Sequence, residues 1–208
     1  MIINIRGTNG SGKTTLARSF QSSDAHVEEV LRRTLPSPTK RDPNRMADAV
    51  VTAVVSHVSG VVGEVACIGS YAQAQGGLDT VGSFELQQEA VLAAAKRWPH
   101  VICEGVLAST VYGSWATTFG ELARDGHDVL VAYLDTPVEV CLSRIRERQE
   151  RAGKVREIKE DQVRDKVRAI NATRDKFAKL PGVTVVELPH RSAWEALLKI
   201  MSDREGMR

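Results

Sequence analysis

The chain has 208 residues, of which 42% are hydrophobic and 26% are charged, and its net charge is +2. This composition is ordinary for a soluble globular domain, and no apolar run approaches the roughly 18 residues that span a bilayer. We therefore expect one cytoplasmic domain over residues 1–208, without membrane contact and without a signal peptide. The cysteines show no paired spacing, so we expect three reduced core residues: Cys67, Cys103 and Cys141.

Predicted strands and helices alternate along the chain. We expect strands at the short apolar runs 2–5, 50–55, 64–68, 101–104, 129–134 and 183–188. We expect helices at 13–20, 84–98, 110–125, 136–180 with a break near 153, and 193–201. The segment 32–45 contains Pro36, Pro38 and Pro43 and is predicted to be a loop. This order predicts an α/β fold with a mainly parallel central sheet.

Residues 7–14 read GTNGSGKT and fit the pattern G-x-x-x-x-G-K-[ST] between a predicted strand and a predicted helix. Glycines let successive backbone N–H groups surround an anion, and the helix N-terminus adds partial positive charge. Lys13 is expected to reach the β- and γ-phosphates and Thr14 to bind Mg²⁺. The alternative is a glycine turn that carries Gly-Lys-Thr by accident. The residues expected to bind the nucleoside triphosphate are Asn9, Gly10, Ser11, Gly12, Lys13, Thr14 and Thr15.

This motif alone does not decide what happens to the γ-phosphate. The sequence lacks the signature of ABC-type ATPases and the Asn-Lys-x-Asp of GTPases, which leaves a small phosphotransferase. Glu104 ends a predicted strand and would emerge near the phosphates, to hold Mg²⁺ or take a proton from an acceptor hydroxyl. It could instead cap the following turn. Asp135 holds a similar position, where a role in starting the next helix is the stronger alternative.

A run of arginines lies in the charged helical region. Arg144, Arg148 and Arg151 fall at i, i+4 and i+7, on one helix face, where they could stabilise a transferring phosphoryl group. We predict an arginine-rich helical lid over about 144–179, which would exclude water; the alternative is a salt-bridged surface helix. A capping box is predicted at the start of this region, formed by Thr136, Pro137 and Glu139.

These features resemble known families. The strand, the glycine-rich loop and YLDTPVEVCLSRIRERQ at 133–149 resemble P-loop nucleoside and nucleotide kinases. The resemblance implies a P-loop kinase-type three-layer sandwich with ATP, Mg²⁺ and the lid. His190 and Arg191 follow the last predicted strand, where such kinases cradle adenine. The thymidylate-kinase branch is expected to carry Asp-Arg where this chain has Glu104-Gly105.

Two further segments are similar to the bacteriophage kinases that phosphorylate 5-hydroxymethyluracil in DNA: IGSYAQAQGGLDTV at 68–81 and VICEGVLASTVYGSW at 101–115. This resemblance implies modified DNA as the partner and the host cytoplasm as the location. Asp79 would then accept the proton of the hydroxymethyl group, with Glu104 as its rival for this role; alternatively Asp79 caps a helix. Tyr71 would stack on the base. The residues expected to bind the substrate are Tyr71, Gly76, Gly77, Asp79 and Arg41, with Gln73 and Gln75 reading the base edge.

Positive charge is concentrated in two segments. Residues 144–179 contain 13 Lys/Arg against seven Asp/Glu, and residues 32–45 contain five against one. This excess favours a DNA acceptor over a free nucleotide, since phosphates could contact Arg32, Arg33, Lys40, Arg41 and Arg45. The expected function is transfer of the γ-phosphate of ATP to 5-hydroxymethyluracil in DNA. The alternatives are a deoxynucleoside or deoxynucleoside monophosphate kinase and a DNA-binding ATPase that transfers nothing. The catalytic residues expected are Lys13, Asp79, Glu104, Arg144 and Arg148.

Overall fold

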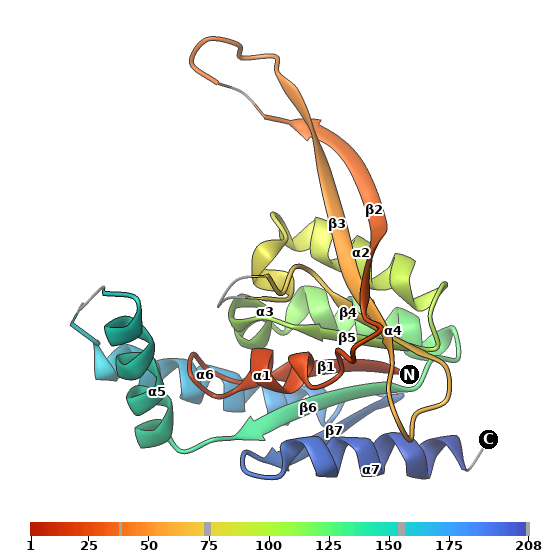
Figure 1. Cartoon of the computed structure of the whole chain (residues 1–208), viewed down its shortest axis with the longest axis vertical. Coiled ribbons are helices and arrows are strands. Elements are labelled where there is room, and N and C mark those ends of the chain that lie inside the picture. Colours follow the sequence, from red (N-terminus) through yellow and green to blue (C-terminus); the bar gives the residue numbers. More distant parts are fainter. Residues whose placement is uncertain (38, 73–75, 154–156, 207–208) are drawn as a thin grey trace.

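The protein is built around one seven-stranded sheet (Figure 1), with strand order β2-β3-β4-β5-β1-β6-β7. The computed structural model describes residues 1–37, 39–72, 76–153 and 157–206. The strands are β1 (Ile2–Arg6), β2 (His26–Pro36), β3 (Met46–His57), β4 (Glu64–Ile68), β5 (His100–Glu104), β6 (Val129–Asp135) and β7 (Val183–Pro189). The helices are α1 (Lys13–Arg18), the 3-10 turn η1 (Leu78–Thr80), α2 (Phe84–Ala95), α3 (Val106–Thr110), α4 (Gly113–Arg124), α5 (Val138–Arg151), α6 (Glu160–Phe177) and α7 (Ala193–Glu205).

The centre of the sheet is parallel, which confirms the predicted α/β class. β1 pairs in parallel with β5 on one side and β6 on the other, and β4 and β7 extend this arrangement. All five residues of β1 are buried because helices cover both faces of the sheet. Ile2 belongs to the core formed with α2, α4 and α6, whereas Ile3 and Ile5 belong to the core formed with α1 and α7. Parallel strands with this alternation bring their carboxyl ends to one edge of the sheet.

One predicted loop is partly a strand. Residues 26–36 form β2, which pairs antiparallel with β3, so the expected loop 32–45 is limited to the turn between them. The predicted strand 50–55 is likewise part of a longer one, Met46–His57. Pro36 does not prevent this pairing because β2 is an edge strand, where the missing N–H can face away from the sheet. Of the three prolines behind the loop prediction, Pro38 lies outside the described residues.

Several helix boundaries also differ from the expectation. The predicted helix 110–125 corresponds to α4, which begins at Gly113, and the short helix α3 before it was not predicted. The predicted break near 153 separates α5 from α6. The capping box at the start of α5 is wrong: Pro137 is the N-cap residue and its helix start has no side-chain cap. Thr136 instead donates its hydroxyl hydrogen bond to the Ser11 carbonyl, 2.9 Å away, and so joins β6 to the glycine-rich loop.

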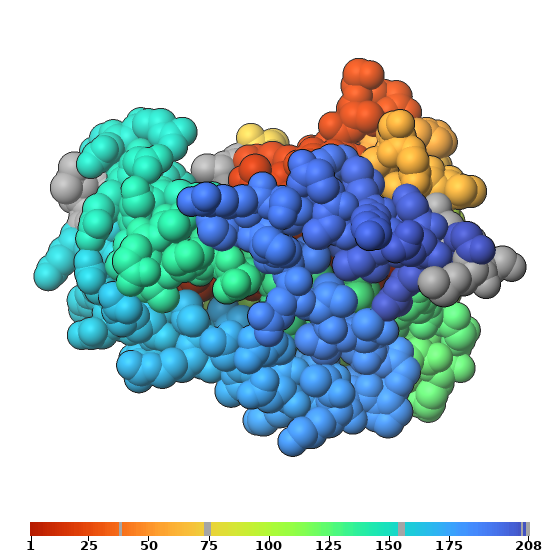
Figure 2. All heavy atoms as spheres, turned by 90° about the horizontal axis from the view of Figure 1, so that it is seen from below, coloured from red at the N-terminus to blue at the C-terminus, as the bar shows by residue number. Residues whose placement is uncertain are grey.

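The N-terminal part of α6 packs with α5 in a hydrophobic cluster of its own, formed by Leu142, Ile145 and Val163. The C-terminal part of α6 is anchored in the main core through Ile170 and Phe177. In the space-filling view α5 stands apart at one end of the molecule (Figure 2). All three cysteines are buried and free, and across the described ranges no helix is both long and apolar enough to cross a bilayer.

Candidate functional site

A large open cleft of about 1100 Å³ lies at the carboxyl edge of the central strands. It brings together most of the residues predicted to act on a nucleotide. Those that line it are Asn9, Gly10, Ser11, Gly12, Lys13, Thr14, Thr15, Gly76, Asp79, Glu104, Arg144 and Arg148. The cleft therefore joins the glycine-rich loop, the end of β5, the turn η1 and one face of α5.

The glycine-rich loop 7–14 follows β1 and is held in place from outside. Gly10 and Gly12 have φ angles of 78° and 104°, which other residues rarely adopt. A Cβ on Gly10 would lie 2.4 Å from the Cys141 carbonyl oxygen, so only glycine lets this loop approach α5 so closely. Arg144 donates to the carbonyls of Gly10 and Ser11 at 3.2 Å. These contacts occupy carbonyl oxygens that would otherwise repel an anion.

Lys13, the first residue of α1, is almost fully buried. Its ammonium group donates to the Thr8 carbonyl at 3.0 Å. Burial lowers the pKa of Lys13, and the negative charges of Glu104 and Asp79 oppose that shift. A buried cation with two carboxylates nearby and few donors committed is suited to bind an anionic ligand.

Glu104, the last residue of β5, lies directly beside Thr14. The Thr14 hydroxyl donates to Glu104 Oε1 at 2.8 Å, and the Glu104 side chain is only 1% exposed. Burial raises the pKa of Glu104 to about 7, while Lys13 and the Thr14 hydroxyl bond act in the opposite direction. The predicted pairing of these two residues as metal ligands is thus geometrically possible, because hydroxyl and carboxylate oxygens are ligands that Mg²⁺ accepts. No cluster of three or more His, Cys, Asp or Glu suited to a metal occurs within the described ranges.

The loop before η1 approaches β5 through two glycines. A Cβ on Gly77 would lie 2.8 Å from Glu104 Oε1, and a Cβ on Gly105 would lie 2.9 Å from Asp79 Oδ1. Gly77 therefore makes room for Glu104 and does not itself line the cleft, which corrects its expected contact with the substrate.

Asp79 is exposed on the wall of the cleft. Its two carboxylate oxygens accept the backbone N–H of Val106 at 3.0 and 2.9 Å, at the start of α3. The predicted alternative, a capping role, is thus present in the structure. It does not remove Asp79 from the site, since a carboxylate has about four lone-pair positions and these bonds leave some open.

Two further predicted substrate residues do not line the cleft. Tyr71 is 7% exposed and its ring packs in the core with α1 and α7, so it has no open face for a base. Its backbone carbonyl accepts a hydrogen bond from Arg18. Arg41 lies in the turn between β2 and β3, outside the cleft lining. Gln73 and Gln75 lie outside the described residues.

The cleft also contains residues that were not predicted from the sequence. Arg18, Lys166 and Trp194 line it together with the expected Arg151, His190 and Arg191. Seven lysines and arginines against four carboxylates give the lining an excess of positive charge: Lys13, Arg18, Arg144, Arg148, Arg151, Lys166 and Arg191 against Asp79, Glu104, Glu147 and Glu195. Arg18 could have been found from its i+4 spacing to Thr14, whereas Lys166 enters the cleft only through the packing of α6 on α5.

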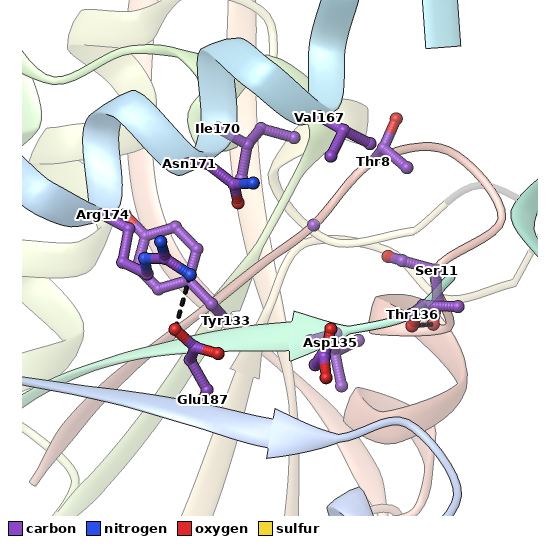
Figure 3. Close-up of a pocket in the computed structure, with 12 residues that line it drawn as sticks. Thr8, Ser11, Tyr133, Asp135, Thr136, Val167, Ile170, Asn171, Arg174 and Glu187 are labelled. Carbon is purple, nitrogen blue, oxygen red and sulfur yellow. Dashed lines mark hydrogen bonds and ion pairs between the residues drawn. The ribbon is translucent and has the colours of Figure 1, made fainter. Parts of the chain in front are cut away.

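A second, smaller pocket of about 100 Å³ lies on the other side of the glycine-rich loop, between β6, β7 and α6 (Figure 3). Arg174 and Glu187 form an ion pair of 2.5 Å on its wall. The buried hydroxyls of Thr8 and Ser11 also line it and have no hydrogen-bond partner within the described part of the chain. Its size and polar lining suit ordered water, so the larger cleft is the candidate site for a ligand.

Comparison with known proteins identifies the family of the chain. Residues 1–192 match the family model described as 5-hmdU DNA kinase. The chain is 37% identical to the 5-hmdU DNA kinase of Pseudomonas phage M6, over 95% of this chain and 93% of that protein. It is 31% identical to the 5-hmdU DNA kinase of Bacillus phage SP10, over 85% of this chain but 25% of that longer protein. A third relative, from Pseudomonas phage PaMx11, carries the same description and is 28% identical over 71% of this chain. No solved structure matches the chain significantly. The chain belongs to the 5-hmdU DNA kinase family.

Proposed function

We propose that this protein transfers the γ-phosphate of ATP to the hydroxymethyl group of 5-hydroxymethyl-2′-deoxyuridine in DNA. The observation that carries the proposal is the single cleft that contains Lys13, the Thr14–Glu104 pair and Asp79. The relatives are named 5-hmdU DNA kinases and come from several phages, which supports the choice of acceptor.

The phosphates of ATP are assigned to the glycine-rich loop, which we propose is a P-loop. Backbone N–H groups of the loop and the N-terminus of α1 supply partial positive charge, and Lys13 supplies a full charge. The adenine end is assigned to the wall formed by His190, Arg191 and Trp194. His190 is held there by a contact of 3.1 Å between its Nδ1 and the Asp135 carbonyl.

Thr14 and Glu104 fit a Mg²⁺ ion that also binds phosphate oxygens and water. One hydroxyl and one carboxylate are a normal protein contribution, because Mg²⁺ in such sites usually keeps several waters and takes its other ligands from the phosphates. When bound, the ion would neutralise charge on the β- and γ-phosphates. The contact between these two side chains already places their oxygens 2.8 Å apart.

Asp79 is proposed as the proton acceptor. It is exposed to the cleft, whereas Glu104 is buried and occupied by Thr14. In the transfer, the hydroxymethyl oxygen forms a bond to the γ-phosphorus as the bond from that phosphorus to the bridging oxygen of ADP breaks. The proton of the hydroxymethyl group passes to Asp79. The backbone N–H bonds from α3 hold the Asp79 carboxylate toward this position.

The C-terminal half of α5, which follows the contacts of Cys141 and Arg144 with the glycine-rich loop, is proposed to act with the first part of α6 as an arginine-rich lid. Its own hydrophobic cluster allows it to move as a unit, while Phe177 anchors the far end of α6. Arg148 and Arg151 are exposed on the face of α5 that lines the cleft. Closure over bound ATP would bring these cations to the phosphoryl group and exclude water.

The acceptor base must leave the DNA stack to reach this cleft, which requires a few kcal/mol of unstacking. Phosphate transfer from γ-labelled ATP tests the whole proposal. The acceptors would be a duplex with one 5-hydroxymethyluracil, the same duplex with thymine, the free nucleoside and its 5′-monophosphate. We expect label on the hydroxymethylated duplex alone.

Label on the nucleoside or the monophosphate alone would contradict the proposal and make the protein an enzyme of the nucleotide pool. Hydrolysis of ATP without label on any acceptor would favour a DNA-binding ATPase. A Lys13→Ala protein is the negative control, since Lys13 lies in the proposed phosphate site.

A further inference from the structure

The β2–β3 hairpin extends beyond the sheet edge that carries the cleft. β4 ends at Ile68, which pairs with Ala53 of β3. The residues of β3 before Ala53 therefore continue past the carboxyl end of β4. Thr52 still accepts a hydrogen bond from the Gly69 N–H, and the residues before it pair with β2. Figure 1 shows this hairpin rising from the body as a long two-stranded ribbon, with its tip leaning toward the side where α5 lies. The ribbon therefore projects from the edge of the sheet that holds Glu104 and the glycine-rich loop.

The base of this ribbon is supported and its tip is not. Leu31 and Ala49 pack against the core, and Arg33 pairs with Glu89 of α2 at 2.9 Å. Toward the tip, Leu35 and Met46 are exposed apolar side chains, with 38% and 53% of their surface accessible.

The structure also separates the basic residues of this region into two groups. Arg32 pairs with Glu29 and Asp48, at 2.6 and 3.1 Å, and Arg33 pairs with Glu89, so both charges are balanced within the protein. The tip carries Lys40, Arg41 and Arg45, all exposed, and within the described residues no carboxylate pairs with them. The single acid of the tip, Asp42, accepts the backbone N–H of Asn44 at 3.1 Å. The tip therefore presents three uncommitted cations.

The reach of the ribbon indicates what it binds. Residues 46–52 extend beyond β4, which is about 24 Å at roughly 3.4 Å per residue. Along DNA this corresponds to roughly seven base pairs at about 3.4 Å each. A nucleoside in the cleft is too small to reach the tip, whereas a duplex that continues past the target base is long enough to reach it.

We propose that the β2–β3 ribbon binds the sugar-phosphate backbone of duplex DNA beside the target base, through Lys40, Arg41 and Arg45 at its tip. This inference rests on the proposed function, because it assumes that the acceptor in the cleft is part of DNA. Contacts of this kind are independent of sequence and depend strongly on salt. The ribbon would hold the duplex while the base occupies the cleft, and ATP binding would not involve it.

The test compares two triple variants of the full chain. In the tip variant, Lys40→Ala, Arg41→Ala and Arg45→Ala remove the three tip cations. In the control variant, Lys96→Ala, Lys179→Ala and Lys199→Ala remove three exposed cations from positions after α2, after α6 and on α7. Both variants lose the same net charge. A third protein, in which Asn-Gly replaces residues 37–45, shortens the ribbon with a two-residue hairpin turn. Circular dichroism verifies that each protein is folded.

Affinity for a fluorescent 24-base-pair duplex is measured by anisotropy between 50 and 200 mM salt. Each phosphate contact contributes about 0.9 to the slope of log affinity against log salt, so we expect the tip variant to lose roughly 2 to 3 from the slope. Between 50 and 200 mM salt, the affinity of the tip variant for DNA should therefore fall roughly 20- to 60-fold less than that of the wild type. The shortened protein should behave like the tip variant and the control variant like the wild type. Equal slopes for the tip variant and the control variant would overturn the inference.

A kinetic arm separates this inference from the proposed function. KM is measured for duplexes with three or twelve base pairs on each side of one 5-hydroxymethyluracil. We expect the wild type and the control variant to prefer the longer duplex, and the tip variant and shortened protein to treat both alike. If the tip variant prefers the longer duplex as strongly as the wild type does, this result contradicts the DNA-binding role of the ribbon but not the proposed function. A wild type that transfers no phosphate to either duplex contradicts the proposed function, while the anisotropy result still decides whether the ribbon binds DNA.

Discussion

Glu104 and Asp79 are two carboxylates in one cleft with different surroundings. Glu104 is buried beside Thr14, and Asp79 is exposed and held by backbone N–H groups of α3. Glu104→Gln should raise the Mg²⁺ concentration needed for half-maximal rate at least tenfold, because a neutral amide is a weaker ligand than a carboxylate. Asp79→Asn should lower kcat by about 10²- to 10⁴-fold with unchanged Mg²⁺ dependence, as expected for loss of a general base.

Titration of Mg²⁺ at saturating ATP and DNA measures both effects. Interchange of the two phenotypes would reverse the assigned roles. An Asp79→Asn enzyme with normal kcat would leave Asp79 with the structural role of holding α3.

The pH dependence follows from the burial of Glu104, which raises its pKa to about 7. Above this pH the side chain is an anion that can bind a cation, and below it the side chain is neutral. We therefore expect kcat/KM to fall as the pH decreases through about 7. A bound cation favours the anionic form, so more Mg²⁺ should move this decline to lower pH. Initial rates between pH 5.5 and 9 at two Mg²⁺ concentrations test this, and a decline that ignores Mg²⁺ would contradict the metal-binding role.

At the scale of elements, the contact between the glycine-rich loop and α5 depends on Gly10. Gly10 has a φ of 78°, which is strained for any residue with a Cβ, and a Cβ there would lie 2.4 Å from the Cys141 carbonyl oxygen. Gly10→Ala should therefore destabilise the fold by about 2–5 kcal/mol, from αL strain of roughly 1–2 kcal/mol and overpacking of roughly 1–3 kcal/mol. Gly60→Ala is the matched control, since Gly60 has a φ of 84° with nothing within 4 Å.

Urea denaturation should show a loss of about 1–2 kcal/mol for Gly60→Ala, from strain alone. Equal losses in the two variants would mean that α5 moves aside to accept the extra methyl group. In that case the contact with α5 would not fix the loop.

Sequence predicts these elements to different extents for physical reasons. β1, β5 and β6 are covered by helices on both faces, so each is a mainly apolar run that can be recognised in the sequence. β2 has no fully buried residue among its eleven, so it lacks both an apolar run and a strict alternation. Pro36 at its end, with Pro38 and Pro43 after it, then suggested a loop. Apolar runs and alternation reveal a strand only when one of its faces is buried, and β2 has no such face.

The same contrast holds within the site. The glycine-rich loop is continuous in sequence. Glu104 was found because it ends an apolar run, and Asp79 because it is the single acid of the segment 68–81. The expected role of Tyr71 was wrong because an aromatic residue in a glycine-rich segment can equally belong to the core, and burial depends on tertiary packing. Lys166 was missed for the same reason.

At the scale of the whole molecule, ATP would join elements from both ends of the chain. The cleft is lined by α1 near the N-terminus, by α5 and by the start of α7. A ligand that binds only the folded state at 100 times its Kd stabilises it by about 2.7 kcal/mol, which raises Tm by roughly 5–10 °C at this size. We expect this shift with ATP and Mg²⁺ in the wild type. Lys13→Ala should remove most of the shift, and an equal shift in that variant, measured by calorimetry, would contradict the phosphate site.

The hairpin leaves and re-enters the sheet at neighbouring positions, since His26 at its start pairs with Val55 near its end. Its length can therefore change without displacing any residue that lines the cleft. Doubling a connecting loop adds only about 0.6 kcal/mol to the entropy of closing it. Under the DNA-binding role proposed for the ribbon, the chain places the chemistry and the contact with the surrounding DNA on separate surfaces. Variants that differ only in this hairpin would therefore perform the same reaction and contact a different length of DNA beside the target base.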